Sequence, residues 1–220
     1  MQGITDTKTE KVADIIAELY PEKIEKILVV GCGDGTEAAV LASKFLAKVI
    51  GIDVVENFDP VASVVAELRL GDAMNLDFEN DVLDFVFSYH ALEHIEDPNR
   101  ALREMQRVLK PGGGFWIGTP NRTRLVGYIG AKEGSIADRI RWNVADYRAR
   151  LTGRFRNEFG AHAGFSASEL GGMLTGVFPT VSNVSDKYFR TVYPRLDGAL
   201  KVARPFSSIL YPSVYFSGRK

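Results

Sequence analysis

The sequence predicts an α/β protein in which short buried strands alternate with helices around a mainly parallel sheet. Short apolar runs rich in β-branched residues recur along the first half, and segments with helical periodicity separate them. The clearest case is Ile27–Val30, which runs directly into glycines at every second position, Gly31, Gly33 and Gly35, before a helical pattern starts at Ala38. A strand, a glycine turn and a helix N-terminus together expose backbone to a ligand.

Length and composition favour one soluble domain. The 220 residues suffice for a full hydrophobic core, and Cys32 is the only cysteine, which argues against a disulfide framework or a thiolate metal cluster. We find no apolar secretion segment and no apolar run long enough to span a bilayer. We therefore expect a cytoplasmic protein without a metal site.

The small net charge of −1 hides an asymmetry between the two halves. Residues 1–120 contain 11 Lys and Arg against 21 Asp and Glu, a net charge of −10, whereas residues 121–220 contain 16 against 7, a net charge of +9. This difference indicates that the two halves contact different partners.

The elements expected in the first half follow from their periodicity. Thr9–Tyr20 has an apolar face and ends at Pro21, and the helix after the glycine turn extends to about Lys48. The later elements are a strand at Val49–Asp53, a helical segment near Pro60–Leu68, a strand at Val82–Ser88, a helix at Asn99–Leu109 that Pro111–Gly114 stops, and a strand at Phe115–Gly118. Right-handed crossovers place the ligand loops at the carboxyl ends of these strands.

The spacing of the glycines limits which class of ligand can bind at this turn. A dinucleotide fingerprint would place its third glycine at Thr36, whereas here it falls at Gly35. A phosphate-binding Walker loop would end in Gly-Lys-Ser/Thr, and Glu37 near the helix start would repel a pyrophosphate. The ligand at this turn is therefore not expected to be held by phosphates.

Five stretches carry a family resemblance over about residues 25–121. They read VVGCGDGTEAA, VIGID, LRLGDAMNL, LDFVFSYHALEHIEDP and EMQRVLKPGGGFWIGTPN. In order and spacing the chain resembles the class I S-adenosylmethionine-dependent methyltransferases, and within them the small type 11 group with the LEH and LKPGG landmarks. The resemblance implies a Rossmann-like, doubly wound sheet of about seven strands with the last one antiparallel, and S-adenosylmethionine as the cofactor, with S-adenosylhomocysteine as its product.

The resemblance also assigns cofactor-binding residues. The glycines would let the backbone approach the methionine portion and the ribose, Asp53 would accept the ribose hydroxyls, and Asp72 would take the adenine amine while Met74 covers the ring. A purely structural turn and solvated surface acids are the alternatives. The full set is Gly31, Cys32, Gly33, Gly35, Asp53, Val54, Gly71, Asp72, Ala73, Met74, Ser88 and Tyr89.

His90 is the candidate catalytic residue, because a histidine with a pKa near neutrality can take a proton from an acceptor hydroxyl. The family does not fix a histidine base at this position. For His94, one helical turn further on, packing or capping is the expected role. Methyl transfer mainly requires that an acceptor be aligned behind the methyl group, so it needs no obvious catalytic motif.

Residues 122–165 read as a helical insertion over the acceptor pocket. Apolar residues recur at helical spacing from Ile136 to Phe155, Ser135 is a plausible N-cap, and arginines occupy the other sides. Tyr147, Arg148 and His162 are the predicted acceptor-binding residues, since an arginine can bind a phosphate or carboxylate. A solvated face is the alternative, and a third is contact of the basic 135–156 helix with a membrane surface. The acidic first half argues against a nucleic-acid substrate.

The predicted organisation is one domain over 1–220, with a cofactor-binding half at 1–121, the insertion at 122–165 and a sheet-completing part at 166–220. In the last part Ser166 and Glu169 form a capping box, and strands are expected near Thr180–Val184 and Val214–Ser217. The predicted function is methyl transfer to a small, anionic, sugar-like or lipid-precursor acceptor by a monomer or homodimer. The alternatives are a non-catalytic binding or regulatory subunit and a transferase that uses a cofactor analogue.

Overall fold

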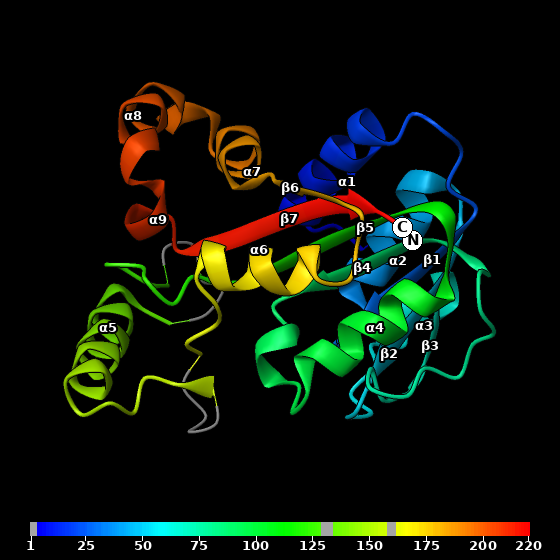
Figure 1. Ribbon diagram of the computed structural model, residues 1–220, viewed down its shortest axis with the longest axis horizontal. Coiled ribbons are helices and arrows are strands. Elements are labelled where there is room, and N and C mark those ends of the chain that lie inside the picture. Colours follow the sequence, from blue (N-terminus) through cyan, green and yellow to red (C-terminus); the bar gives the residue numbers. More distant parts are fainter. Residues whose placement is uncertain (1–3, 129–133, 158–161) are drawn as a thin grey trace.

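The computed structural model describes residues 4–128, 134–157 and 162–220 (Figure 1). At its centre is a seven-stranded sheet in the order β3-β2-β1-β4-β5-β7-β6, in which β7 runs antiparallel to its neighbours β5 and β6. The strands are β1 Lys26–Val30, β2 Lys48–Asp53, β3 Glu67–Leu70, β4 Leu83–Tyr89, β5 Leu109–Pro120, β6 Thr180–Asn183 and β7 Ser213–Arg219. The predicted doubly wound sheet with a final antiparallel strand is confirmed.

Helices cover both faces of the sheet. They are α1 Thr7–Leu19, α2 Thr36–Phe45, α3 Ala62–Val65, α4 Pro98–Val108, α5 Ile136–Leu151, α6 Ala167–Thr175, α7 Ser185–Val192, α8 Asp197–Ala203 and α9 Ser207–Leu210. One core packs α1, α2 and α7 against Phe85, Phe87 and Trp116, and the other packs α4 and α6 against Val86, Phe115 and Ile117. Alternate residues of β4 and β5 thus enter opposite cores, as the pleat of a strand requires.

Side chains at the helix starts explain several boundaries. The Asp6 carboxylate accepts the Thr9 N–H at the start of α1, and Asp97 caps α4 in front of Pro98 at the first helical position. The predicted N-cap Ser135 is confirmed, and its side chain and that of Asp138 bond each other's backbone N–H in a capping box. Ser166 and Glu169 form the predicted capping box of α6.

Several element boundaries differ from those predicted, and the predicted 135–156 helix ends at Leu151. The segment near Pro60–Leu68 is helical only at Ala62–Val65, because Glu67–Leu70 pairs with Ile50–Asp53 as the edge strand β3. The helix α2 ends at Phe45, where Leu46 adopts a left-handed conformation and Lys48 pairs with Lys26. The proline-glycine run belongs to β5, whose pairing with β4 shifts register between Leu83 and Phe85 before the strand continues.

The inserted region lies at one end of the sheet, beside the carboxyl end of β5. Figure 1 shows α5 there, with α8 and α9 nearby. The helix α5 has no buried residue, and Leu151 on its predicted apolar face is 89% exposed. Within the described residues, no helix is long and apolar enough to cross a membrane.

Candidate functional site

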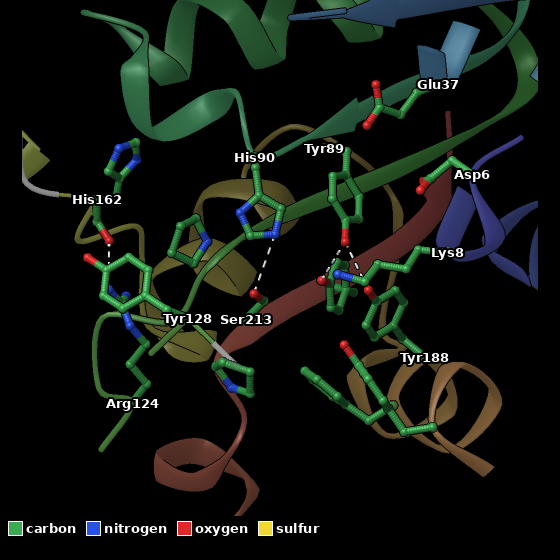
Figure 2. Close-up of a pocket in the computed structure, with 15 residues that line it drawn as sticks. Asp6, Lys8, Glu37, Tyr89, His90, Arg124, Tyr128, His162, Tyr188 and Ser213 are labelled. Carbon is green, nitrogen blue, oxygen red and sulfur yellow. Dashed lines mark hydrogen bonds between the residues drawn. The ribbon is translucent and has the colours of Figure 1, made fainter. Parts of the chain in front are cut away.

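Two cavities lie at the carboxyl ends of the parallel strands and meet at His90. The first, the glycine cavity, has a volume of about 510 Å³ and is lined mainly by the ends of β1, β2 and β3 and the segment after β4. The second, the tyrosine cavity, has a volume of about 340 Å³ and is lined mainly by side chains from α1, β4, α7 and β7 and from the loops that follow β5 (Figure 2). His90 lines both.

The glycine turn forms the wall of the glycine cavity with bare backbone. Gly31 and Gly33 have φ angles of 71° and 53°, in the left-handed region that disfavours other residues. A Cβ at Gly31 would lie 2.2 Å from the Ala91 Cβ, whereas one at Gly33 meets no atom within 4 Å. Gly31 is therefore required by the packing of the turn, and Gly33 leaves space at the cavity wall.

Two carboxylates line the same cavity at strand ends. Asp53 ends β2, and its oxygens accept the N–H groups of Gly33 at 2.9 Å and Val55 at 3.1 Å. Asp72 follows β3, and its Oδ1 accepts the Met74 N–H at 2.8 Å. These bonds hold the two loops at the rim of the cavity. The remaining predicted residues that line it are Val54, Gly71, Ala73 and Met74.

Four predicted cofactor residues do not line the glycine cavity: Cys32, Gly35, Ser88 and Tyr89. Cys32 is buried in the core, and burial, followed by the charge of Asp53, raises the pKa of its thiol to about 12. Gly35 has a φ of 88° and packs against Leu68 and Ala62, where a Cβ would clash, so it serves the packing of the turn. Ser88 is fully buried within β4.

Tyr89 belongs to the tyrosine cavity instead. Its hydroxyl lies 2.9 Å from that of Tyr188 and 3.3 Å from that of Tyr215, and Figure 2 shows Tyr89 and Tyr188 pointing toward each other. The Tyr188 and Tyr215 rings stack with centroids 3.8 Å apart. Burial, above all, raises the pKa of Tyr89 and of Tyr215 well above the usual value for a phenol. The hydroxyls therefore stay protonated and can donate or accept a hydrogen bond.

His90 has an unusual backbone at the junction of the cavities. It adopts a φ of 56°, rare for a residue other than glycine, and its N–H donates to the Gly118 carbonyl at 2.8 Å. Its Nε2 lies 3.4 Å from the Ser213 Oγ. Burial lowers the pKa of the ring to about 3, with smaller contributions from the charges of Lys8 and Arg124. The imidazole is therefore neutral near pH 7.

Arg124 fixes the loop that brings His162 to the tyrosine cavity. Arg124 is 3% exposed, and its guanidinium donates to the His162 carbonyl at 3.0 Å and to the Asp146 carboxylate at 2.8 Å. Tyr147 donates its hydroxyl to the Leu125 carbonyl, and Arg148 is exposed. Neither Tyr147 nor Arg148 lines either of the two cavities. The helix α5 therefore supports the loop through Asp146 and does not itself form the cavity wall.

Three residues of the tyrosine cavity were not predicted from the sequence: Tyr188 on α7, and Ser213 and Tyr215 on β7. Glu93 was not predicted either; it is 4% exposed, and burial raises its pKa to about 7. Periodicity could have indicated Tyr215, since it alternates with Val214 and Phe216 in a strand. No local pattern marks α7 as a cavity wall.

Comparison with known proteins places the glycine cavity within a known domain. A family model described as a methyltransferase domain matches residues 28–117. The chloroplastic tocopherol O-methyltransferase of Arabidopsis thaliana is 33% identical over 126 residues, which cover 53% of this chain and 33% of that protein. The chain spans less than half the length of the curated relatives it matches.

Solved structures share the fold. One is the Haemonchus contortus phosphoethanolamine N-methyltransferase 2 in complex with phosphomonomethylethanolamine and S-adenosylhomocysteine. It superposes with a TM-score of 0.61 at 19% sequence identity, and the match covers 96% of this chain and 52% of that one. The [4+2]-cyclase SpnF superposes with a TM-score of 0.59 at 18% sequence identity, and the match covers 96% of this chain and 80% of the SpnF chain. At these identities the likeness concerns the fold alone.

Proposed function

We propose that the chain transfers a methyl group to a small molecule, because residues 28–117 match a methyltransferase-domain model and the curated relatives include a probable S-adenosylmethionine-dependent methyltransferase. In this proposal S-adenosylmethionine occupies the glycine cavity and the acceptor occupies the tyrosine cavity. We also propose that the protein is located in the cytoplasm, as its sequence predicts.

The observation that carries the proposal is the junction of the two cavities at His90. Methyl transfer needs an acceptor atom placed in line with the methyl group and the sulfur, with water excluded. Two adjoining cavities of different lining meet that need, because each can hold one reactant while the reacting atoms meet between them.

In the glycine cavity, we assign the methionine portion and ribose to the backbone of Gly31 and Gly33. The Asp53 carboxylate accepts hydrogen bonds from the ribose hydroxyls, in addition to those that it accepts from the Gly33 and Val55 N–H groups. The loop of Asp72, Ala73 and Met74 holds the adenine. Cofactor binding by Cys32, Gly35 and Ser88 is then indirect, through the shape of the turn and of β4.

In the tyrosine cavity, the acceptor contacts protonated phenols and a neutral imidazole. The hydroxyls of Tyr89 and Tyr188 orient a polar group, and the aromatic rings suit an apolar or ring-bearing body. His90, the proposed catalytic residue, accepts a hydrogen bond from the acceptor hydroxyl and orients it toward the methyl group. We propose a hydroxyl compound with an apolar body as the acceptor, and the name of the tocopherol O-methyltransferase supports an oxygen acceptor.

The test combines cofactor binding with product detection. We expect S-adenosylhomocysteine to bind at a 1:1 ratio in isothermal titration calorimetry. We also expect methyl-labelled S-adenosylmethionine, incubated with the protein and an extract of its own source organism, to label a small molecule found by mass spectrometry. Absence of cofactor binding would refute the proposal.

A second candidate function is suggested by the [4+2]-cyclase, whose fold this chain shares although its name describes a different reaction. The chain would then bind the cofactor without transferring the methyl group. Binding of S-adenosylhomocysteine with no labelled product and no turnover of S-adenosylmethionine, in the presence of the extract, would favour this function over methyl transfer.

A further inference from the structure

The three histidines of the chain gather around one buried carboxyl group. The His90 Nδ1 lies 3.8 Å from the Glu93 Oε1, and the His94 Nε2 lies 3.9 Å from the same oxygen. The rings of His94 and His162 meet edge to face with centroids 4.9 Å apart. His162 comes from a loop distant in sequence, so the fold assembles this cluster from two segments.

Glu93 is an unsatisfied group within this cluster. Its side chain is 1% exposed, and neither carboxylate oxygen has a hydrogen-bond partner among the described residues. Burying a carboxylate without compensation is unfavourable, and protein structures compensate it with a hydrogen-bond partner, a proton or a bound cation. The histidine nitrogens nearest to Glu93 lie beyond hydrogen-bond distance, which leaves room between the groups.

We propose that Glu93, His94 and His162 bind one divalent transition-metal ion of the zinc class. One donor atom from each of these residues lies within 4.8 Å of the other two. Ligands at about 2.0–2.2 Å from a tetrahedral ion lie about 3.3–3.6 Å apart. The described donor atoms therefore need to approach one another by up to about 1.5 Å to share an ion, and the two exposed histidines can move that far.

The donor set selects the kind of ion. Two imidazole nitrogens and one carboxylate oxygen suit zinc, ferrous iron and related ions, whereas magnesium and calcium prefer oxygen ligands alone. Three protein ligands leave at least one coordination position open, as in catalytic rather than structural zinc sites. The site therefore takes an exchangeable ligand.

The position of the cluster suggests what that ligand is. His94 lines the glycine cavity and His162 lines the tyrosine cavity, so the ion lies at the border between the two. This role rests on the proposed function: the ion binds the acceptor hydroxyl that His90 orients, and the hydroxyl loses its proton to solvent as the acceptor enters, before water is excluded. The oxygen then forms a bond to the methyl carbon, and the sulfur–carbon bond breaks with its electron pair going to sulfur. The substrate class is thus a hydroxyl compound that can coordinate a metal.

The experiment measures metal binding on the full chain without cofactor or acceptor. The protein is stripped with a chelator and titrated with Zn²⁺ against a chromophoric chelator, and with Co²⁺, whose visible absorption reports the ligand geometry. The variants are Glu93→Gln and His162→Ala. Glu79→Gln is the matched control, since it removes the same charge from an exposed position outside both cavities. Circular dichroism verifies that each variant is folded.

We expect one Zn²⁺ per chain, with affinity at least about 100-fold weaker in Glu93→Gln and in His162→Ala and unchanged in Glu79→Gln. No binding by the wild type, or equal binding by folded Glu93→Gln and His162→Ala, would overturn the metal site. Titration of S-adenosylhomocysteine separates this outcome from the proposed function. Cofactor binding without Zn²⁺ binding refutes only the metal site, and the reverse result refutes only the methyltransferase assignment.

Discussion

The glycine cavity and the tyrosine cavity are built in different ways. The first is lined by residues between Val30 and Glu96, largely at the ends of neighbouring parallel strands, and its glycines Gly31, Gly33 and Gly71 present bare backbone. The second draws side chains from Asp6 near the start of the chain to Tyr215 near its end. A cavity of backbone is fixed by the topology of the sheet, whereas a cavity of side chains can change its lining while the sheet stays the same. We therefore expect the first to bind a common cofactor and the second to set the acceptor.

The largest effect is expected from a methyl group placed in the glycine cavity. Gly33→Ala should weaken S-adenosylhomocysteine binding about 100-fold, because crowding a filled site costs up to about 3 kcal/mol. Gly112→Ala is the matched control, since Gly112 also has a positive φ and a Cβ there also meets no atom within 4 Å. Calorimetric titration of both variants with S-adenosylhomocysteine distinguishes the effect of backbone strain from that of a methyl group that blocks the ligand. Equal affinities of the two variants would show that Gly33 does not face the cofactor.

A smaller loss of cofactor affinity is expected when Asp53, the carboxylate proposed to bind the ribose, is neutralised. Asp53→Asn keeps an oxygen that can accept the Gly33 N–H but removes the charge, so we expect about tenfold weaker binding of S-adenosylhomocysteine. Glu56→Gln removes the same charge from an exposed position three residues away and should leave the affinity unchanged. If Asp53→Asn binds as tightly as the wild type, the ribose assignment is wrong.

The tyrosine cavity should respond through the acceptor alone. Tyr188→Phe removes the hydroxyl that lies 2.9 Å from Tyr89, and we expect about a 2- to 10-fold loss in kcat/KM for the acceptor. The affinity for S-adenosylhomocysteine should not change, because Tyr188 does not line the glycine cavity. An equal loss in both quantities would show that the two cavities act as one.

The smallest effect is expected outside both cavities. Tyr147→Phe removes a hydrogen bond to the Leu125 carbonyl from an exposed ring, which should lower the free energy of unfolding by no more than about 1 kcal/mol. The kinetic constants for the acceptor should stay at their wild-type values. A raised KM would restore Tyr147 to the acceptor site that the sequence analysis predicted for it.

The same contrast explains how much the sequence could predict. The spacing of Gly31 and Gly33, and the acids Asp53 and Asp72 at strand ends, placed the glycine cavity because parallel strands bring their carboxyl ends to one edge. The burial of Ser88 was not predictable from its position, because β4 is buried on both faces and the side chains on neither face are exposed to solvent along the strand.

The tyrosine cavity was less predictable because its walls meet only in the folded chain. Tyr188 lies on α7, a short helix that the periodicity did not indicate, and it reaches Tyr89 across 99 residues of sequence. The start of α5 was predicted correctly, but the helix ends at Leu151 rather than near residue 156, and its apolar residues Ile136 and Leu151 are exposed. The inserted segment contributes to the cavity through Arg124, Tyr128 and His162 in its loops. Periodicity identified the helix and not its neighbours.

The most direct test of the account is a crystal structure of the full chain with S-adenosylhomocysteine. We predict the ligand in the glycine cavity, with its ribose hydroxyls hydrogen-bonded to the Asp53 carboxylate, its adenine beside Met74 and its sulfur directed toward His90. The tyrosine cavity should remain open to an acceptor. S-adenosylhomocysteine bound in the tyrosine cavity, or bound without contact to Asp53, would contradict the assignment of the two cavities.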